Sequence, residues 1–238
     1  GEAILRMYPD ANAGADLATS NRFVAAPVAR QTQHHGLAKL DWLPGINDRV
    51  AMHYAITDSD RFNPYDPLFA YSGLPGFGDS YVSRAQLLGL TWNRVLSPRM
   101  VNEARLGGNR LRFGVLQENS GQDKAGALGF PRITERLVSQ GFPNVAVAGF
   151  ESIGEPTNTP QQRNDNTIHF AETLAISPLS AWRHHIRLGG EVRVIRLNLL
   201  TDIFSRGLWQ FSGITGNSLQ ELVLGIPTVA ALSQGDTF

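Results

Sequence analysis

The sequence contains no cysteine. This absence excludes disulfide bonds, thiolate metal sites and a cysteine nucleophile, although it does not assign the chain to a compartment. An excess of one charge is also missing, since 21 basic residues balance 21 acidic residues over 238 positions. Without a basic run, nucleic acid is not an expected partner.

Long apolar runs are absent as well. No stretch approaches the roughly 20 apolar residues that a membrane-spanning helix requires. This excludes a helical span but leaves a membrane-spanning barrel open, because barrel strands alternate apolar and polar residues and produce a weaker signal.

Motifs of catalysis and metal binding are not found. There is no Gly-x-Ser-x-Gly sequence, and no acidic pair has a spacing typical of glycosidases. The histidine pairs at 34–35 and 184–185 would point to opposite faces of a strand and could not bind one ion together. The polar clusters at 58–60 and 164–166 are more typical of turns than of calcium sites. We therefore expect no enzyme activity, no metal and no cofactor.

A β-hairpin is predicted over residues 36–57. Before its turn, apolar residues at even positions alternate with Lys39 and Asp41, and after it apolar residues at even positions alternate with smaller, more polar ones. The segment 44–48 (Pro-Gly-Ile-Asn-Asp) supplies the residue types that a chain reversal requires.

The same period-two pattern predicts further strands at 81–92, 100–112, 167–176 and 181–197. A short strand is expected at 207–212.

Three other segments are expected to be irregular or helical. Residues 217–225 predict a short helix, with Asn217 or Ser218 as N-cap and Gly225 as its stop. Residues 1–20 are expected to form a loop with one helical turn at the start. Residues 21–31 form at best an irregular strand, because proline removes a ladder donor.

The predicted connections alternate between short turns, at 43–48, 95–99 and 177–183, and long loops, at 58–80 and 113–164. Loops of this length are uncommon in compact soluble domains, whereas membrane barrels have short turns at one end and long loops at the other. We therefore predict an all-β fold of antiparallel up-and-down strands. They would form an open, curved sheet of about seven or eight strands that is part of a transmembrane β-barrel.

The polar faces of the predicted strands carry charges of both signs among glycines. We expect these charges to line the lumen of a large barrel, with opposite charges meeting across neighbouring strands, while the apolar faces meet lipid. The expected lumen residues are Lys39, Asp41, Glu103, Arg105, Arg187, Glu191 and Arg193. Trp42, Trp92 and Trp182 lie beside the short turns, where an interfacial aromatic girdle is expected.

Four groups of segments resemble a known family. They are 38–42 (Ala-Lys-Leu-Asp-Trp) with 48–54 (Asp-Arg-Val-Ala-Met-His-Tyr); 97–107 (Ser-Pro-Arg-Met-Val-Asn-Glu-Ala-Arg-Leu-Gly); 166–170 (Asn-Thr-Ile-His-Phe) with 185–193 (His-Ile-Arg-Leu-Gly-Gly-Glu-Val-Arg); and 211–227 (Phe-Ser-Gly-Ile-Thr-Gly-Asn-Ser-Leu-Gln-Glu-Leu-Val-Leu-Gly-Ile-Pro). Their order and spacing resemble the barrel of TonB-dependent receptors of the Oar-like type, which carry a carboxypeptidase-regulatory-like domain. No single motif is specific, and the likeness runs from about residue 20 to the C-terminus.

The resemblance implies a middle section of a barrel of roughly 22 strands in the outer membrane. Such a receptor takes up a large substrate with energy delivered by the TonB complex, so outer-membrane lipid, TonB and an unknown large substrate are the implied partners. Residues 1–20 would be a loop or a preceding barrel segment, and 21–238 a partial barrel. The plug domain, the TonB box and a signal peptide are not in the sequence, so we expect an internal fragment.

Aromatic residues of the first long loop have two interpretations. They either pack against one another or provide a ligand-contacting surface at the barrel mouth, in which case Tyr65, Phe69 and Tyr71 would contact substrate. An alternative function for the whole chain also stays open. It is a secreted, soluble all-β binding or adhesion module, such as one for carbohydrate, in which the apolar faces pack against a second sheet.

Overall fold

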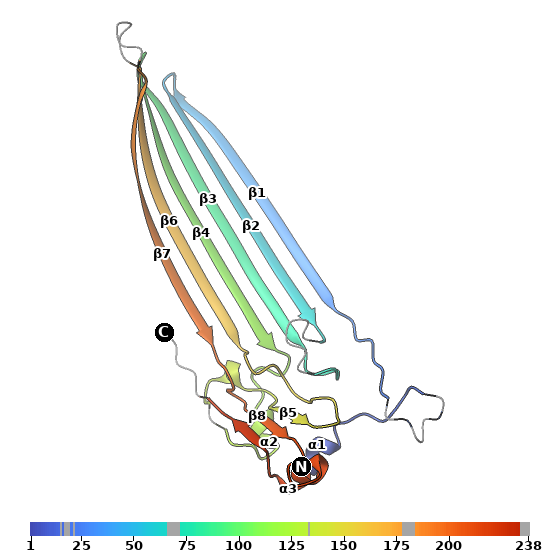
Figure 1. Ribbon diagram of the computed structural model, residues 1–238. Coiled ribbons are helices and arrows are strands. Elements are labelled where there is room, and N and C mark those ends of the chain that lie inside the picture. The colour runs from blue at the N-terminus through green and yellow to red at the C-terminus, as the bar shows by residue number, and fades with distance from the viewer. Residues whose placement is uncertain are drawn as a thin grey trace.

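The computed structural model describes residues 1–14, 16, 20, 22–65, 72–132, 134–177 and 184–233. Two parts are evident in Figure 1, a tall sheet of long strands and a small folded unit at one end of it. We call this unit the cap. No helix among the described residues is long and apolar enough to cross a membrane.

The tall sheet has six strands in the order β1-β2-β3-β4-β6-β7. Every neighbouring pair is antiparallel. The strands are β1 (Arg30–Gly45), β2 (Asp48–Asn63), β3 (Asp79–Ser97), β4 (Met100–Gln117), β6 (Gln161–Ile176) and β7 (Ile186–Thr201). Because β1 and β7 are the two edges, the sheet is open. The predicted antiparallel up-and-down arrangement is confirmed, with six strands in this sheet rather than seven or eight.

Short and long connections lie at opposite ends of the sheet, as expected (Figure 1). The short ones are at 46–47 and 98–99, and the long ones join β2 to β3 and β4 to β6. The β6–β7 turn lies largely outside the described residues.

The predicted bounds of the long loops are wrong, because β2 continues to Asn63 and β4 to Gln117, and β6 begins at Gln161. In these extensions, polar residues occupy the strand face that is apolar nearer the short turns. The alternation of apolar and polar residues therefore ends there, although the hydrogen bonds between strands continue. Of the segment 21–31, where at best an irregular strand was expected, the described residues 22–29 contain only an isolated bridge from Arg22 to Ala13, and β1 begins at Arg30. The clusters at 58–60 and 164–166 lie inside β2 and β6 and not in turns.

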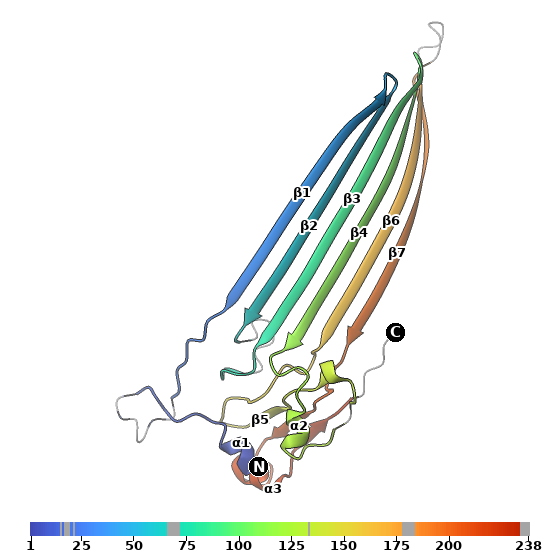
Figure 2. The ribbon, with the colours of Figure 1, turned by 180° about the vertical axis from the view of Figure 1, so that it is seen from behind.

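The cap is built from segments far apart in the chain (Figures 1 and 2). Its three-stranded sheet has the order β5-β8-β9, with β5 and β8 parallel. Its elements are α1 (Glu2–Leu5), α2 (Lys124–Ala127), η1 (Leu137–Ser139), β5 (Asn144–Val147), β8 (Leu208–Phe211), α3 (Ser218–Leu224) and β9 (Val229–Ala231). The core of the cap is formed by Ile4, Leu74, Phe77, Phe142, Val145, Val147, Ile153, Phe211 and Leu222.

Two short elements of the cap confirm predictions made from local signals. The strand expected at 207–212 is β8. The helix expected at 217–225 is α3, whose N-cap Asn217 accepts hydrogen bonds from the N–H groups of Leu219 and Gln220. Gly225 ends the helix in the left-handed region, with a φ of 71°, which glycine adopts without steric cost.

Candidate functional site

All seven charged residues that were singled out lie on one face of the tall sheet. Residues opposite one another on paired strands share a face, and every second residue along a strand returns to it. One row across the six strands runs Asp41, Ala51, Thr91, Arg105, Ala171, Glu191. The next row contains Lys39 and Arg193 at its two ends. Glu103 and Arg187 lie on the same face by the same alternation, and we call it the charged face.

The singled-out residues take part in three acid–base pairs on the charged face. Arg49 Nη2 lies 3.1 Å from Asp41 Oδ1, and Arg193 Nη2 lies 2.6 Å from Glu191 Oε1. Arg105 also pairs with Glu103. Only the first pair joins two strands, so the expectation of cross-strand pairing is wrong for the other two, which join residues two apart on one strand. These pairs are exposed, and each contributes at most about 1 kcal/mol to stability.

The centre of the charged face is a trough over two glycines. Gly89 and Gly107 lie opposite each other on β3 and β4, flanked by His53 on β2 and His169 on β6. A Cβ atom on Gly89 would lie 2.1 Å from His53 Cε1, and one on Gly107 would lie 2.0 Å from His169 Cε1. The glycines therefore leave room for two imidazole rings that lie over the sheet. Sequence reasoning missed these histidines, because only the strand register brings them to the glycines.

The opposite face is apolar over the half of the sheet nearest the short turns. We call this region the apolar band. Its larger side chains are Leu40, Trp42, Met52, Tyr54, Leu88, Leu90, Trp92, Leu106, Ile168, Phe170, Leu174, Leu188, Val192 and Val194. No protein segment covers the band within the described structure, as the 67% exposure of Val192 and the 60% exposure of Ile168 show. Glu172, which interrupts the apolar pattern of its strand, lies in this band between Ala104 and Gly190.

Aromatic residues lie at both limits of the apolar band. Trp42 and Trp92 both lie opposite Val50 in the row near the short turns, and Trp92 Nε1 donates to Asp48 Oδ1 at 2.9 Å. The third expected tryptophan, Trp182, lies outside the described residues. At the other limit, Gln86 Nε2 donates to Tyr54 Oη at 2.8 Å. Both ends of the band thus combine an aromatic ring with a polar contact.

At about mid-height the apolar band ends, and on some strands the polarity of both faces inverts. Beyond Tyr54 the apolar band gives way to a row in which Ile56 is followed by Gln86, Arg110, Asn166 and Arg196. The next row includes Asp58, Arg84, Arg112 and Asn164. Over the same height the charged face becomes largely apolar on β4 and β7, where Leu111, Ile195 and Leu197 are exposed. On β2 and β6 it stays polar, with residues such as Arg61 and Asp165. Because the apolar band ends at mid-height, an apolar period is visible over only about half of each strand.

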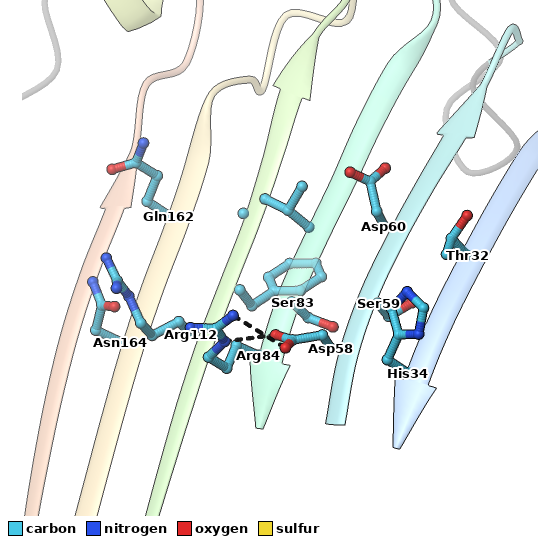
Figure 3. Close-up of a pocket in the computed structure, with 13 residues that line it drawn as sticks. Thr32, His34, Asp58, Ser59, Asp60, Ser83, Arg84, Arg112, Gln162 and Asn164 are labelled. Atoms are coloured by element: carbon cyan, nitrogen blue, oxygen red, sulfur yellow. Dashed lines mark hydrogen bonds and ion pairs between the residues drawn. The ribbon is translucent and has the colours of Figure 1, made fainter. Parts of the chain in front are cut away.

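A hollow occupies the polar half of the face that carries the apolar band (Figure 3). Its lining includes Thr32, His34, Asp58, Arg84, Arg112 and Asn164. Arg84 binds Asp58 in a bidentate manner, with Nε to Oδ1 at 2.6 Å and Nη2 to Oδ2 at 3.0 Å. Among the described residues, no group of three or more histidine, aspartate or glutamate side chains is arranged to hold a metal ion.

The loop aromatics are only partly described. Tyr65 is half-buried, and its hydroxyl donates to the carbonyl oxygen of Ala25 at 3.3 Å. Phe69 and Tyr71 lie outside the described residues. Phe77, from the same loop, packs edge-on against Phe142 in the cap core, with ring centroids 4.9 Å apart. At least one aromatic side chain of this loop therefore serves the packing of the cap.

A buried ion pair connects the long connections of the cap. Arg206 is 4% exposed and Glu155 is fully buried, with Arg206 Nε 3.6 Å from Glu155 Oε2. Arg206 also donates to the carbonyl oxygens of Pro156 and Thr159, and Glu155 accepts from the N–H groups of Asn119 and Phe142. Burial lowers the pKa of Arg206, while its negative neighbours, chiefly Glu155, act in the opposite direction. No local sequence signal identifies this pair, because its partners are far apart in the chain.

A family model described as "Outer membrane beta barrel domain" matches residues 1–238. No curated protein and no solved structure matches the chain significantly.

Proposed function

Because the chain belongs to the outer membrane beta barrel family, we propose that its six-stranded sheet is one arc of a transporter barrel of the TonB-dependent, Oar-like type. In this proposal the apolar band faces lipid and the charged face lines the lumen. The single observation that carries it is that the apolar band and the charged face occupy the two sides of the same stretch of strand. The proposed role is transport of a large substrate, with no chemical change to it.

Strand length supports a large barrel that extends beyond the membrane. The strands of the sheet have 16 to 19 residues, whereas about 9 to 11 tilted residues span a membrane. The apolar band accounts for the spanning half, and the other half continues toward the cap. Long connections on one side of the membrane are typical of barrels with extracellular loops. We place the cap outside the cell, where it would meet substrate first.

The open edges support closure by further strands. The structure describes no partner strand beyond β1 or β7, and exposed edges of this length are prone to pair with other strands. A barrel removes both edges. Closure around the charged face would enclose the trough of Gly89 and Gly107 within the lumen.

Single-cysteine labelling tests the proposed orientation, because the chain has no native cysteine. Cysteine is placed in turn at positions 191, 192, 193 and 194 of β7 in the complete barrel, reconstituted in bilayers. We expect a membrane-impermeant maleimide to label positions 191 and 193. A fluorophore at position 192 or 194 should instead be quenched by lipids with brominated acyl chains. Quenching at 191 and 193 would reverse the assignment of the two faces.

The alternative of a secreted soluble module makes a different prediction in the same experiment. In that case positions 192 and 194 would be packed against a second sheet and no position would be quenched by lipid. The protein would also stay monomeric without detergent. The apolar band is uncovered in the described structure, which favours the membrane.

Energised uptake is the finer part of the proposal, and it rests on the resemblance to Oar-like receptors. We expect the complete receptor to bind the periplasmic domain of TonB, measured by co-purification from detergent-solubilised outer membranes. As a control, the chain without the remaining parts of the receptor should not retain TonB. If the complete receptor does not bind TonB, uptake is not energised and the barrel would act as a passive pore.

A further inference from the structure

We propose that Arg110, Arg112 and Arg196 form a site on the outer surface of the barrel for the phosphate group of an anionic membrane lipid. We call these three residues the arginine belt. The inference rests on the proposed function, because it requires that the apolar band face lipid.

Strand register places the three arginines close to one another on one face of the sheet. Arg110 on β4 lies opposite Asn166 on β6, which in turn lies opposite Arg196 on β7. Arg112 is two residues from Arg110 along β4 and lies opposite Asn164. All three arginines are exposed and lie on the face that carries the apolar band. Two amide side chains therefore lie among three cations on three adjacent strands.

The arginine belt lacks acidic partners. Within the part of the chain that the structure describes, no carboxylate lies at ion-pair distance from Arg110, Arg112 or Arg196. The contrast with Arg84, one strand away, is direct, because Arg84 is held by both oxygens of Asp58 (Figure 3). Like charges grouped on one sheet face repel one another. A bound anion would remove that repulsion.

The position of the arginine belt identifies the anion as part of a lipid. The row immediately below it on the same face contains Gly108, Ile168 and Val194, which belong to the upper limit of the apolar band. Adjacent rows on one face are two residues apart, or about 7 Å. A lipid with its acyl chains along the apolar band would thus place its phosphate at Arg110 and Arg196. A soluble phosphate has no acyl chains, so the neighbouring apolar band would not increase its affinity for the arginine belt.

Arginine chemistry fits such a ligand. A guanidinium group donates two parallel hydrogen bonds to phosphate oxygens, and it is more weakly hydrated than an ammonium group. The amide N–H groups of Asn164 and Asn166 are further donors within the same patch. Basic residues near an anionic membrane surface each contribute about a fivefold gain in affinity.

The test uses the complete barrel in dodecyl maltoside, with retained lipid counted by native mass spectrometry. Phosphatidylglycerol is the anionic probe and phosphatidylcholine the zwitterionic one. We expect the triple variant R110Q/R112Q/R196Q to bind phosphatidylglycerol roughly a hundredfold more weakly than the unaltered barrel. The matched control R105Q/R187Q/R193Q removes three arginines from the same two strands on the charged face and should leave phosphatidylglycerol binding unchanged.

Several outcomes overturn the proposal. If both triple variants lose phosphatidylglycerol binding equally, the effect is one of net charge and not of a site. If R110Q/R112Q/R196Q loses no binding, the proposed site does not exist. Competition by glycerol phosphate as strong as that by phosphatidylglycerol would indicate a soluble phosphate ligand instead. If the triple variant does not fold, as judged by heat modifiability, single variants are used, with about a fivefold loss expected for each.

Failure of the arginine belt can be told apart from failure of the proposed function. If positions 192 and 194 are quenched by brominated lipid while the belt variants bind phosphatidylglycerol normally, only the belt is wrong. If those positions are not quenched, the membrane orientation itself is wrong and the belt fails with it.

Discussion

Buried polar residues of the cap hold several chain segments together. Glu155 and Arg206 are both almost fully buried, and each also bonds to main-chain groups of separate loop segments. Gly141 permits this arrangement, since a Cβ atom there would lie 2.2 Å from Glu155 Oε2. Breaking one side of a buried pair leaves the other charge without compensation, which is far more costly than losing an exposed pair.

Arg206→Gln is therefore expected to destabilise the cap by about 3–5 kcal/mol. Hydrogen exchange of the Val145 and Ile153 amides, which bond to each other's carbonyl oxygens, measures the effect. The control Arg132→Gln breaks exposed pairs with Asp123 and Glu135 and should change protection by less than about 1 kcal/mol. Equal protection in both variants would contradict the structural role of the buried pair.

Glu221 gives a pH-dependent prediction at the same scale. Its carboxylate accepts hydrogen bonds from the N–H groups of Thr215 (2.7 Å) and Gly213 (2.8 Å). These bonds, that from Thr215 first, hold the pKa of Glu221 below its ordinary value of 4.5. Because the pKa of Glu221 is lowered in the folded state, the stabilisation is fully present at pH values above the ordinary pKa. It is lost as the pH falls from that value through the lowered pKa. Exchange protection of the Thr215 amide should thus fall as the pH drops below 4.5, and Glu221→Gln should abolish that dependence. Protection that is unchanged by acid would contradict the assignment.

At the scale of the single element, β7 shows most clearly that a long strand can have two halves of opposite amphipathicity. In β7, Val192 and Val194 lie on the face of the apolar band, whereas Ile195 and Leu197 lie on the other face farther from the short turns. One strand thus meets two different environments along its length. The apolar period predicts only the half in which it runs unbroken, which explains why the predicted strands were too short at the end nearest the cap. At its other end the strand predicted at 181–197 was too long, because β7 begins at Ile186.

Val192→Arg tests the environment of the lower half. A charged residue on the lipid face costs about 2–4 kcal/mol near the bilayer midplane, so the free energy of unfolding in urea, measured in bilayers, should fall by that amount. The control Ile195→Arg places the same side chain on the opposite face of the same strand and should have a much smaller effect. Similar losses in both variants would contradict a lipid-facing apolar band.

At the scale of the whole molecule, the sheet and the cap are stabilised in different ways. The cap has its own buried core, whereas the sheet has large apolar side chains exposed on both faces. The sheet therefore depends on lipid, or on further strands and segments, to cover these surfaces. Large exposed apolar areas of this kind mark interaction or membrane sites.

We expect the 238-residue chain to remain monomeric only in detergent. Without detergent, its apolar band and the open edges β1 and β7 should drive association, which analytical ultracentrifugation would detect as large species. Addition of dodecyl maltoside should restore a discrete species of constant composition. A detergent-free monomer would instead favour the soluble binding module.

The sequence by itself determined the local features of this protein. Period-two alternation identified the strand-forming segments, and Asn217 and Gly225 marked the ends of α3, because capping depends on neighbours within a few residues. It also predicted short turns at one end, and an antiparallel all-β class that the family match supports. Alternation along single strands also predicted that the seven charged residues lie on polar strand faces, and the register places them on one face. That this face lines a lumen stays a prediction.

Only the tertiary structure decided which of these residues meet. Strand register brings His53 and His169 to Gly89 and Gly107, groups the arginine belt, and pairs Glu103 and Glu191 along their strands rather than across them. The cap could not be predicted from the sequence either, because its core residues Ile4, Val145 and Leu222 come from three distant segments. The physical reason is the same in each case: these contacts depend on strand pairing and packing over long separations, and a one-residue change of register would move every side chain to the other face.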